Sequence, residues 1–241
     1  MNTKILFLSL ISGLSTVIGC IILLIGNKYK DNVLSFSFGL AGSVMFLISI
    51  LELVPEAISY SINIMSIPIL FIVSLIIMVS GGVIVNLLDK YTNKENELYN
   101  IGWLCMLSIL IHNVPEGIIT SLSFLSNYNF GIKMFLIILI HNIPEGISIA
   151  APIYYSGNGV KKSLFYSLIS GAGEFIGAIL GLSIFRFFNV TLLMYFLLML
   201  TAGIMIYLSL TKLFVNGIKI RKYNYFIFGI VIGILVVFTT L

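Results

Sequence analysis

The sequence predicts an all-α polytopic membrane protein with eight transmembrane helices. Hydrophobic residues make up 59% of the 241 residues, charged residues only 9%, and the mean hydropathy is +1.14. Because soluble globular chains carry about 25% charged residues, this composition is typical of a chain that is solvated by lipid. The apolar residues also fall into runs of roughly 20, the length that crosses a bilayer core. The net charge of +4 is spread over the ends of these runs and gives no indication of nucleic-acid binding.

Eight apolar runs define the predicted spans in order. They lie near residues 5–26, 33–57, 67–88, 99–124, 131–154, 163–185, 191–212 and 223–241. The first run could be a signal peptide that ends at Cys20, but it continues through Ile25 and exceeds the 7–15 residues of a signal-peptide core. We therefore expect a retained first span. The longest polar segment, Leu88–Asn100, is too short for a soluble domain, so residues 1–241 are predicted to form one transmembrane domain.

The distribution of basic residues predicts the orientation. The odd-numbered loops hold ten of them: Lys28, Lys30, Lys90, Lys94, Lys161, Lys162, Lys212, Lys219, Arg221 and Lys222. The termini and even-numbered loops hold three: Lys4, Lys133 and Arg186. Cytoplasmic loops carry an excess of Lys and Arg. The odd-numbered loops are therefore predicted to be cytoplasmic, and both termini are predicted to lie outside.

Two nearly identical phrases carry the chemistry. IHNVPEGI at 111–118 lies near the middle of the fourth span and IHNIPEGI at 140–147 near the middle of the fifth, and together they contain both histidines of the chain. Glu174 lies halfway along the sixth span and Met45 near the middle of the second, so these groups share one depth. A charged side chain at the bilayer centre costs about 2.5–3.5 kcal/mol, and clustered carboxylates repel one another. A bound cation is the simplest compensation.

The spacing within each phrase supports a metal site. His112 and Glu116 are four residues apart and share one helix face, as do His141 and Glu145. The proline in each phrase removes a backbone hydrogen bond and crowds the carbonyl four residues earlier, which is tolerated at membrane depth where that backbone lines a cavity. The glycine after each glutamate, Gly117 or Gly146, permits close approach of neighbouring helices.

Polar residues continue above and below this depth, as a transport route would require. The three stripes are Gly42, Met45, Ser49, Glu52 and Glu56; Cys105, Ser108, His112, Glu116 and Thr120; and Ser163, Ser167, Ser170 and Glu174. Simpler interpretations exist. A membrane histidine can serve a helix–helix hydrogen bond, serines can serve packing, and Met45 and Cys105 can be ordinary buried residues. Glu52 and Glu56 are either solvated helix-end acids or an access funnel, and we expect Asp89 to be a solvated cap.

The paired HNVPEG and HNIPEG motifs, together with GSVM in the second span and ISGAGE in the sixth, resemble the ZIP (Zrt/Irt-like) divalent metal transporters, in particular their bacterial ZupT/GufA-like branch. The resemblance covers the whole chain and implies a ZIP-type bundle with a mid-membrane, often binuclear, metal site. One subsite would use His112, Glu116, His141 and Glu145, with Met45 nearby. The other would use Asn113, Asn142 and Glu174, with Glu116 and Glu145 bridging. Some relatives have Asp where this chain has Asn142, which removes a carboxylate here.

The resemblance further implies an importer of divalent metal that works by alternating access, in which spans 1, 4, 5 and 6 move against the others, and a homodimer in the cell membrane. Imidazole with carboxylate suits Zn²⁺, and also Fe²⁺, Mn²⁺, Co²⁺ or Cd²⁺. The metal would be cargo, and no cofactor is expected. An intramembrane metal-dependent hydrolase is the alternative enzyme class, but HExxH is absent. A metal-sensing receptor is a third possibility, although the chain shows no soluble domain with which to signal.

Overall fold

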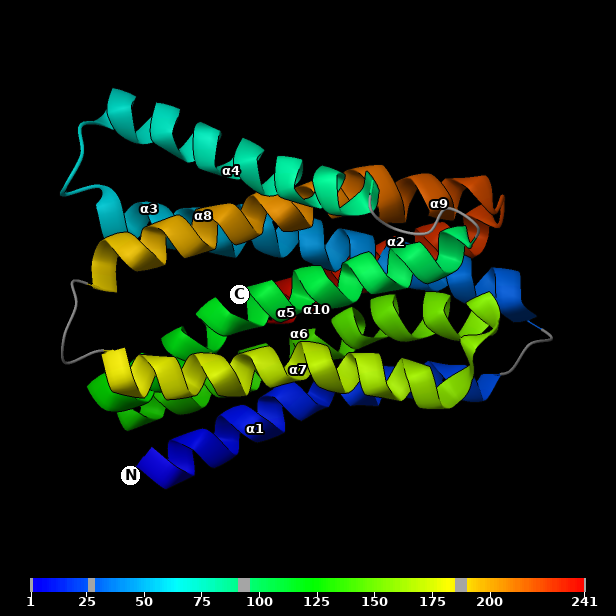
Figure 1. Ribbon diagram of the computed structural model, residues 1–241, viewed down its shortest axis with the longest axis horizontal. Helices are drawn as coiled ribbons and strands as arrows, with labels where there is room; N and C mark the ends of the chain where they lie inside the picture. Colours follow the sequence, from blue (N-terminus) through cyan, green and yellow to red (C-terminus); the bar gives the residue numbers. More distant parts are fainter. Residues whose placement is uncertain (1, 26–28, 91–95, 185–189, 241) are drawn as a thin grey trace.

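The computed structural model describes residues 2–25, 29–90, 96–184 and 190–240, and every regular element among them is a helix (Figure 1). The helices, in order, are α1 (Asn2–Ile18) with the 3₁₀ segment η1 (Gly19–Ile25); α2 (Lys30–Ile48), the π-helical η3 (Ser49–Leu53) and α3 (Val54–Ser61); α4 (Ile67–Lys90); α5 (Glu97–Ser126); α6 (Tyr128–Ile153) with the π-helical η4 (Tyr154–Asn158); α7 (Gly159–Ile184); α8 (Val190–Leu208), the π-helical η5 (Ser209–Leu213) and α9 (Phe214–Lys219); and α10 (Tyr223–Thr240).

The helices confirm a polytopic all-α membrane protein. Six stretches are long and apolar enough to cross a bilayer: Asn2–Ile21, Lys30–Ser61, Ile67–Lys90, Glu97–Leu125, Tyr128–Ser183 and Thr191–Lys219. The stretch Tyr128–Ser183 contains 56 residues and includes α6, η4 and α7. The shorter apolar helix Tyr223–Thr239 follows at the end of the chain.

The connections between α5, α6 and α7 use few residues. Asn127 caps α6, because its side-chain oxygen accepts a hydrogen bond from the backbone N–H of Phe130 at 3.1 Å. The reversal between α6 and α7 depends on Gly157 (φ 94°) and Gly159 (φ 75°), which adopt the left-handed conformations that glycine tolerates. The polar stretch 154–162, which separates two predicted spans, is therefore interrupted at Gly157 and Gly159, where the backbone leaves the helical conformation and the chain reverses.

The bundle contains a closely packed group of four helices, α1, α5, α6 and α7. A methyl group added at Gly117 of α5 would overlap the carbonyl oxygen of Glu174 in α7, and one added at Gly146 of α6 would overlap that of Thr16 in α1. The glycine of each repeated phrase thus provides the close helix approach that the sequence predicts. Of the remaining helices, α2 packs against α10 and α4 packs against α8. In addition, α2 contacts α6, and α8 contacts α5.

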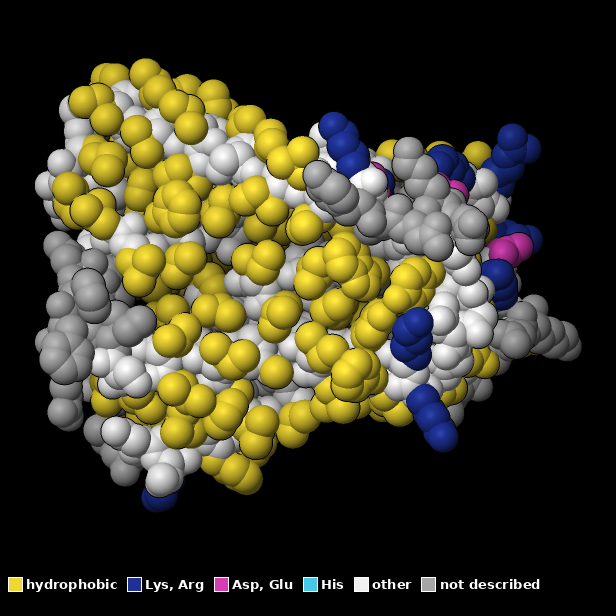
Figure 2. All heavy atoms as spheres, in the orientation of Figure 1, with side chains coloured by type: hydrophobic (Ala, Val, Ile, Leu, Met, Phe, Trp, Pro, Cys, Tyr) yellow, Lys and Arg dark blue, Asp and Glu magenta, His cyan; other side chains and the backbone are white. Residues whose placement is uncertain are grey.

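The surface has a broad apolar band and one strongly basic end. Figure 2 shows hydrophobic side chains across the middle of the visible face and Lys and Arg gathered at one end. Phe7, Phe71 and Phe238 are 62%, 69% and 65% exposed, which suits contact with lipid. We call the basic end the one formed by the start of α2, the end of α4, the α6–α7 turn and the segment from η5 to the α9–α10 turn. It carries Lys30, Lys90, Lys161, Lys162, Lys212, Lys219, Arg221 and Lys222. Lys4 and Lys133 lie at the opposite end, and Lys28, Lys94 and Arg186 lie outside the described residues.

Candidate metal centre

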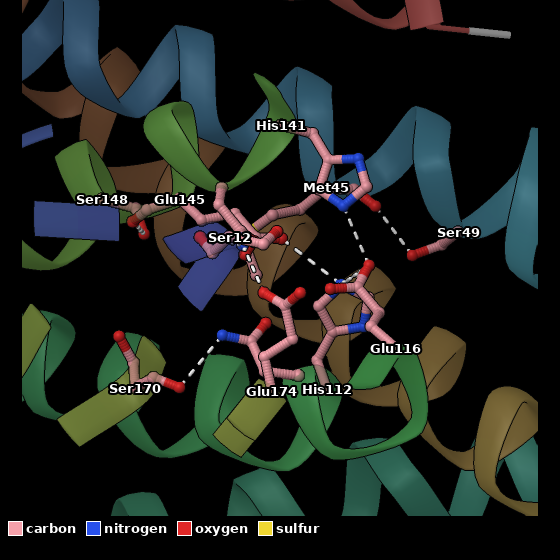
Figure 3. A network of polar contacts seen from close by, with 12 residues as sticks. Ser12, Met45, Ser49, His112, Glu116, His141, Glu145, Ser148, Ser170 and Glu174 are labelled. Carbon is pink, nitrogen blue, oxygen red and sulfur yellow. Dashed lines mark hydrogen bonds and ion pairs between the residues drawn. The ribbon is translucent and has the colours of Figure 1, made fainter. Parts of the chain in front are cut away.

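Both repeated phrases meet in the interior of the four-helix group. Oε1 of Glu116 lies 3.0 Å from Nε2 of His112, one turn earlier in α5, and 2.9 Å from Nε2 of His141 in α6. Oε1 of Glu145 lies 3.5 Å from the same nitrogen of His112. His112, Glu116 and His141 each offer one ligand atom, and these three atoms lie within 4.8 Å of one another. A single ion could therefore contact all three residues. Figure 3 shows these side chains pointing toward one another from facing helices.

These side chains hold more hydrogen-bonding capacity than the protein uses. Exposure is 4% for Glu116, 1% for His141 and 0% for His112 and Glu145. Both carboxylate oxygens of Glu145 and Oε2 of Glu116 are buried and have no hydrogen-bond partner. Burying a carboxylate without a partner is strongly unfavourable. A dication among these atoms would supply the missing partner, and imidazole with carboxylate oxygen is a suitable ligand set for zinc.

A second polar group lies beside the first and joins α1, α5, α6 and α7. Nδ2 of Asn142 donates to the backbone carbonyl of Ser12 at 3.1 Å and to Oε2 of Glu174 at 3.0 Å. Nδ2 of Asn113 donates to the backbone carbonyl of Ser170 at 3.0 Å. The side-chain oxygens Oδ1 of Asn113 and Asn142 and Oε1 of Glu174 are buried without partners. All three predicted members of the second subsite are therefore in one neighbourhood, with unpaired oxygens.

The remaining stripe residues have different environments. Met45 is fully buried in α2, which packs against α6, and its backbone carbonyl accepts a hydrogen bond from Ser49; its role as a metal ligand stays a prediction. The hydroxyls of Ser163 and Ser170 donate to carbonyls of their own helix, which favours the packing interpretation for that stripe. Cys105 is a buried free thiol.

A cavity of about 490 Å³ leads from the end opposite the basic end down to Glu116. Its walls come from η3, α3, α5, α6 and α8, and they include Glu52, Leu53, Glu56, Tyr60, Ile119, Phe130 and Ile138. We call this cavity the vestibule. Glu52 is not a helix-end acid, because η3 continues α2 into α3 without interruption. Of the two interpretations left open by the sequence, the structure therefore favours the access funnel.

At the basic end, two ion pairs connect neighbouring helices. Nζ of Lys212 in η5 lies 2.5 Å from Asp89 of α4, and Nζ of Lys219 in α9 lies 2.9 Å from Glu97 of α5. The prediction that Asp89 is a solvated cap is wrong, because its carboxylate is paired across two helices. A cavity of about 320 Å³ lies here; it includes all four of these side chains and none of the central histidines or glutamates.

Ser12 is the functional-site residue that the sequence did not indicate. Its carbonyl orients Asn142, and its own hydroxyl is buried without a hydrogen-bond partner. A serine in the first span resembles any small packing residue, and only the approach of α1 to α6 and α7 gives it this position. The sequence signal that could have found it is the three-residue spacing of Ser9, Ser12 and Ser15, which places small polar side chains along one side of the first span.

Fold and site together define a polytopic membrane protein built around a buried imidazole–carboxylate cluster. Comparison with known proteins agrees with this class. The sequence model of the family described as ZIP Zinc transporter matches residues 89–240, which contain both repeated phrases and Glu174. This chain belongs to the ZIP zinc transporter family.

Individual relatives align along nearly the whole chain. The zinc transporter ZupT of Chlorobaculum parvum is 34% identical, with 100% of this chain and 98% of the relative aligned. The protein of the same name from Clostridium perfringens is 32% identical, with 97% and 93% aligned, and that from Streptococcus mutans is 30% identical, with 97% and 95% aligned. The resemblance to the ZupT-like branch, first indicated by the repeated phrases, is thereby confirmed.

Proposed function

We propose that this chain is a secondary transporter that imports divalent transition metal ions, zinc foremost, through a site between α2, α5, α6 and α7. The observation that carries the proposal is Glu116, whose Oε1 contacts both histidines while Oε2 is buried and unpaired. Membership of a family of zinc transporters supports it and gives no support to an enzyme. Fe²⁺, Mn²⁺, Co²⁺ and Cd²⁺ are further candidate cargoes, because the same ligand types bind them.

The proposed ligands are those predicted from the sequence. His112, Glu116, His141 and Glu145 form the first subsite, and Met45 stands near it. Asn113, Asn142 and Glu174 form the second, and Glu116 and Glu145 bridge the two. The unpaired oxygens of both groups support this assignment. The second group has only one carboxylate of its own, so we expect one tightly held dication and a weaker second one.

The proposed topology is a single transmembrane domain over residues 1–241 with eight passes and both termini outside. Six stretches are long enough to cross a bilayer, and counting α6 and α7 as two passes, because Gly157 and Gly159 reverse the chain between them, gives seven. The shorter apolar helix Tyr223–Thr239 would be the eighth. The gathering of described basic residues at one end supports a cytoplasmic basic end. In this orientation the vestibule opens outward, and the protein resides in the cell membrane.

Alternating access would move α1, α5, α6 and α7 as one unit. Contacts at Gly117 and Gly146 leave no room for a methyl group and make this group compact. The neighbouring helix α2 presents Met45, a flexible side chain, beside the central residues (Figure 3). An inside-negative potential favours inward movement of a dication by about 4.6 kcal/mol per 100 mV, at about 2.3 kcal/mol per charge. A homodimer is part of the proposal through the resemblance to the family.

The test is zinc uptake into proteoliposomes. Glu116→Ala and Glu145→Ala should each reduce the uptake rate by at least about tenfold, because each removes a carboxylate from the buried site at a loss of about 1.4 kcal/mol or more. Asp31→Ala, which removes an exposed acid in the first turn of α2, is the matched control and should transport like the wild type. Normal uptake by both site variants would refute the site assignment.

A further inference from the structure

The vestibule contains acidic side chains to which the central site gives no role. Glu52 lies in η3 and Glu56 one turn further along in α3, and both line the cavity whose base is formed by Glu116. Most of the other lining residues are apolar: Leu53, Ile119, Leu122, Leu125, Phe130, Met134, Ile138 and Leu198. Two carboxylates in a largely apolar passage attract a cation more strongly than the same groups in open water.

Glu52 is placed in the passage by an irregularity of its helix. The turn Ser49–Leu53 is π-helical, and a π turn holds more residues than an α turn, so it rotates the residues that follow relative to those before. Within the part of the chain that the structure describes, the half-buried carboxylate of Glu52 has no hydrogen-bond or ion-pair partner. Its electrostatic neighbours are His141, His112 and Glu116 of the central cluster and Glu56. A cation in the passage would add the direct partner that this half-buried carboxylate lacks.

An independent observation points to a cation in the same cavity. Glu116 is 96% buried, being only 4% exposed, and its unpaired Oε2 belongs to a side chain that lines the base of the vestibule. Glu52 is not a member of the tight group of His112, Glu116 and His141. The vestibule therefore presents a separate carboxylate station outside the central cluster, with an unpaired central carboxylate oxygen at its inner end.

We propose that Glu52, assisted by Glu56, forms an outer capture site that binds an incoming hydrated divalent cation and passes it to Glu116. The inference rests on the proposed transport function. Carboxylate oxygens with retained water are ligands that a dication accepts before it loses the rest of its hydration shell. The imidazoles of the central cluster then complete the ligand set that zinc prefers.

Transport kinetics test the capture site. With zinc added on the vestibule side of proteoliposomes, Glu52→Gln should raise KM for zinc roughly tenfold, which corresponds to about 1.4 kcal/mol of binding, and leave the maximal rate within about twofold. Glu56→Gln should raise KM less, because Glu56 is more exposed. Asp31→Asn removes one acid outside the vestibule and should leave KM unchanged. An unchanged KM for Glu52→Gln would overturn the proposal.

A labelling experiment tests the same position without relying on transport. In a background with the buried cysteines replaced, Cys20→Ser and Cys105→Ser, a Glu52→Cys variant should react with a membrane-impermeant thiol reagent added to the vestibule side. Micromolar zinc should slow that reaction severalfold. Lack of reaction, or a rate that zinc does not change, would refute capture at this residue. A Lys4→Cys variant, exposed at the same end of the molecule as the vestibule, should react at a rate that zinc does not change.

The two proposals fail in different ways. If wild-type protein moves no zinc in proteoliposomes, the transport function is wrong. If the wild type transports, Glu116→Ala does not, and Glu52→Gln has the wild-type KM, only the capture site is wrong.

Discussion

At the scale of single residues, the two asparagines of the repeated phrases act through both ends of their amides. The nitrogen of Asn113 donates to the carbonyl of Ser170, and that of Asn142 donates to Ser12 and to Glu174. Because an amide has separate donor and acceptor ends, these bonds leave both Oδ1 atoms unpaired and available to a cation. Asn142 also stabilises the neighbouring carboxylate of Glu174, which an aspartate at 142 could not do when ionised.

Asn142→Asp should therefore make stability depend on zinc. The new carboxylate would repel that of Glu174 and could no longer donate a hydrogen bond to the carbonyl of Ser12. The protein without metal should therefore unfold at a lower temperature, by about 2–4 °C for each 1 kcal/mol of stability lost. Excess zinc should restore the transition and raise the zinc content above that of the wild type. Thermal unfolding in detergent with and without zinc, followed by elemental analysis, measures both.

The control for this change is Asn216→Asp. Asn216 is another buried asparagine whose Nδ2 donates to a backbone carbonyl, that of Lys212 at 2.8 Å, but it lies in α9. It should lose stability without any rescue by zinc. Equal behaviour of the two variants, or an unaltered transition for Asn142→Asp, would contradict the assignment of Asn142 to the metal centre.

At the scale of helices, the sequence predicts what depends on local pattern and misses what depends on packing. Long apolar runs correctly indicated the helices, and the i, i+4 spacing correctly placed His112 beside Glu116. The π turns were not predicted, because a single widened turn leaves no mark on hydrophobic periodicity. The ion pair of Asp89 with Lys212 was missed for a similar reason, since 123 residues separate the partners. From the residues alone, His141 and Glu116 were predicted only to converge at one depth, and their place in one subsite came from the resemblance to the ZIP family.

Gly146→Ala tests the close helix approach beside the site. A methyl group there would overlap the carbonyl oxygen of Thr16 and lie 2.6 Å from its carbon, so backbone must move, at a cost of about 1–3 kcal/mol. The yield of monodisperse protein and its zinc uptake should both fall clearly below wild type, as size-exclusion chromatography and uptake assays would show.

Gly82→Ala is the matched control. Its added methyl group would lie 3.1 Å from the ring of Tyr207, a side chain that can shift slightly. This variant should stay close to wild type. Equal tolerance of the two changes would mean that the approach of α1 to α6 does not require glycine.

At the scale of the whole molecule, the two ends of the bundle differ, and in the proposed alternating-access cycle this difference would set a direction. The vestibule reaches Glu116 from the end opposite the basic end. The cavity at the basic end is lined by none of the central ligands, and the ion pair of Lys219 with Glu97 joins α9 to α5 there. This arrangement corresponds to a state open on one side. Whether that state loads or releases metal depends on which end faces the cytoplasm.

The positive-inside rule predicts that the basic end is cytoplasmic and that the vestibule opens outward. In the background without native cysteines, Lys4→Cys should react with an impermeant maleimide in intact cells, because Lys4 is exposed at the end with the vestibule. Lys161→Cys, exposed at the basic end, should react only after the membrane is permeabilised. The reverse pattern would place the vestibule in the cytoplasm. Glu52 would then meet the metal on its way out of the site, and the structure would represent the releasing state.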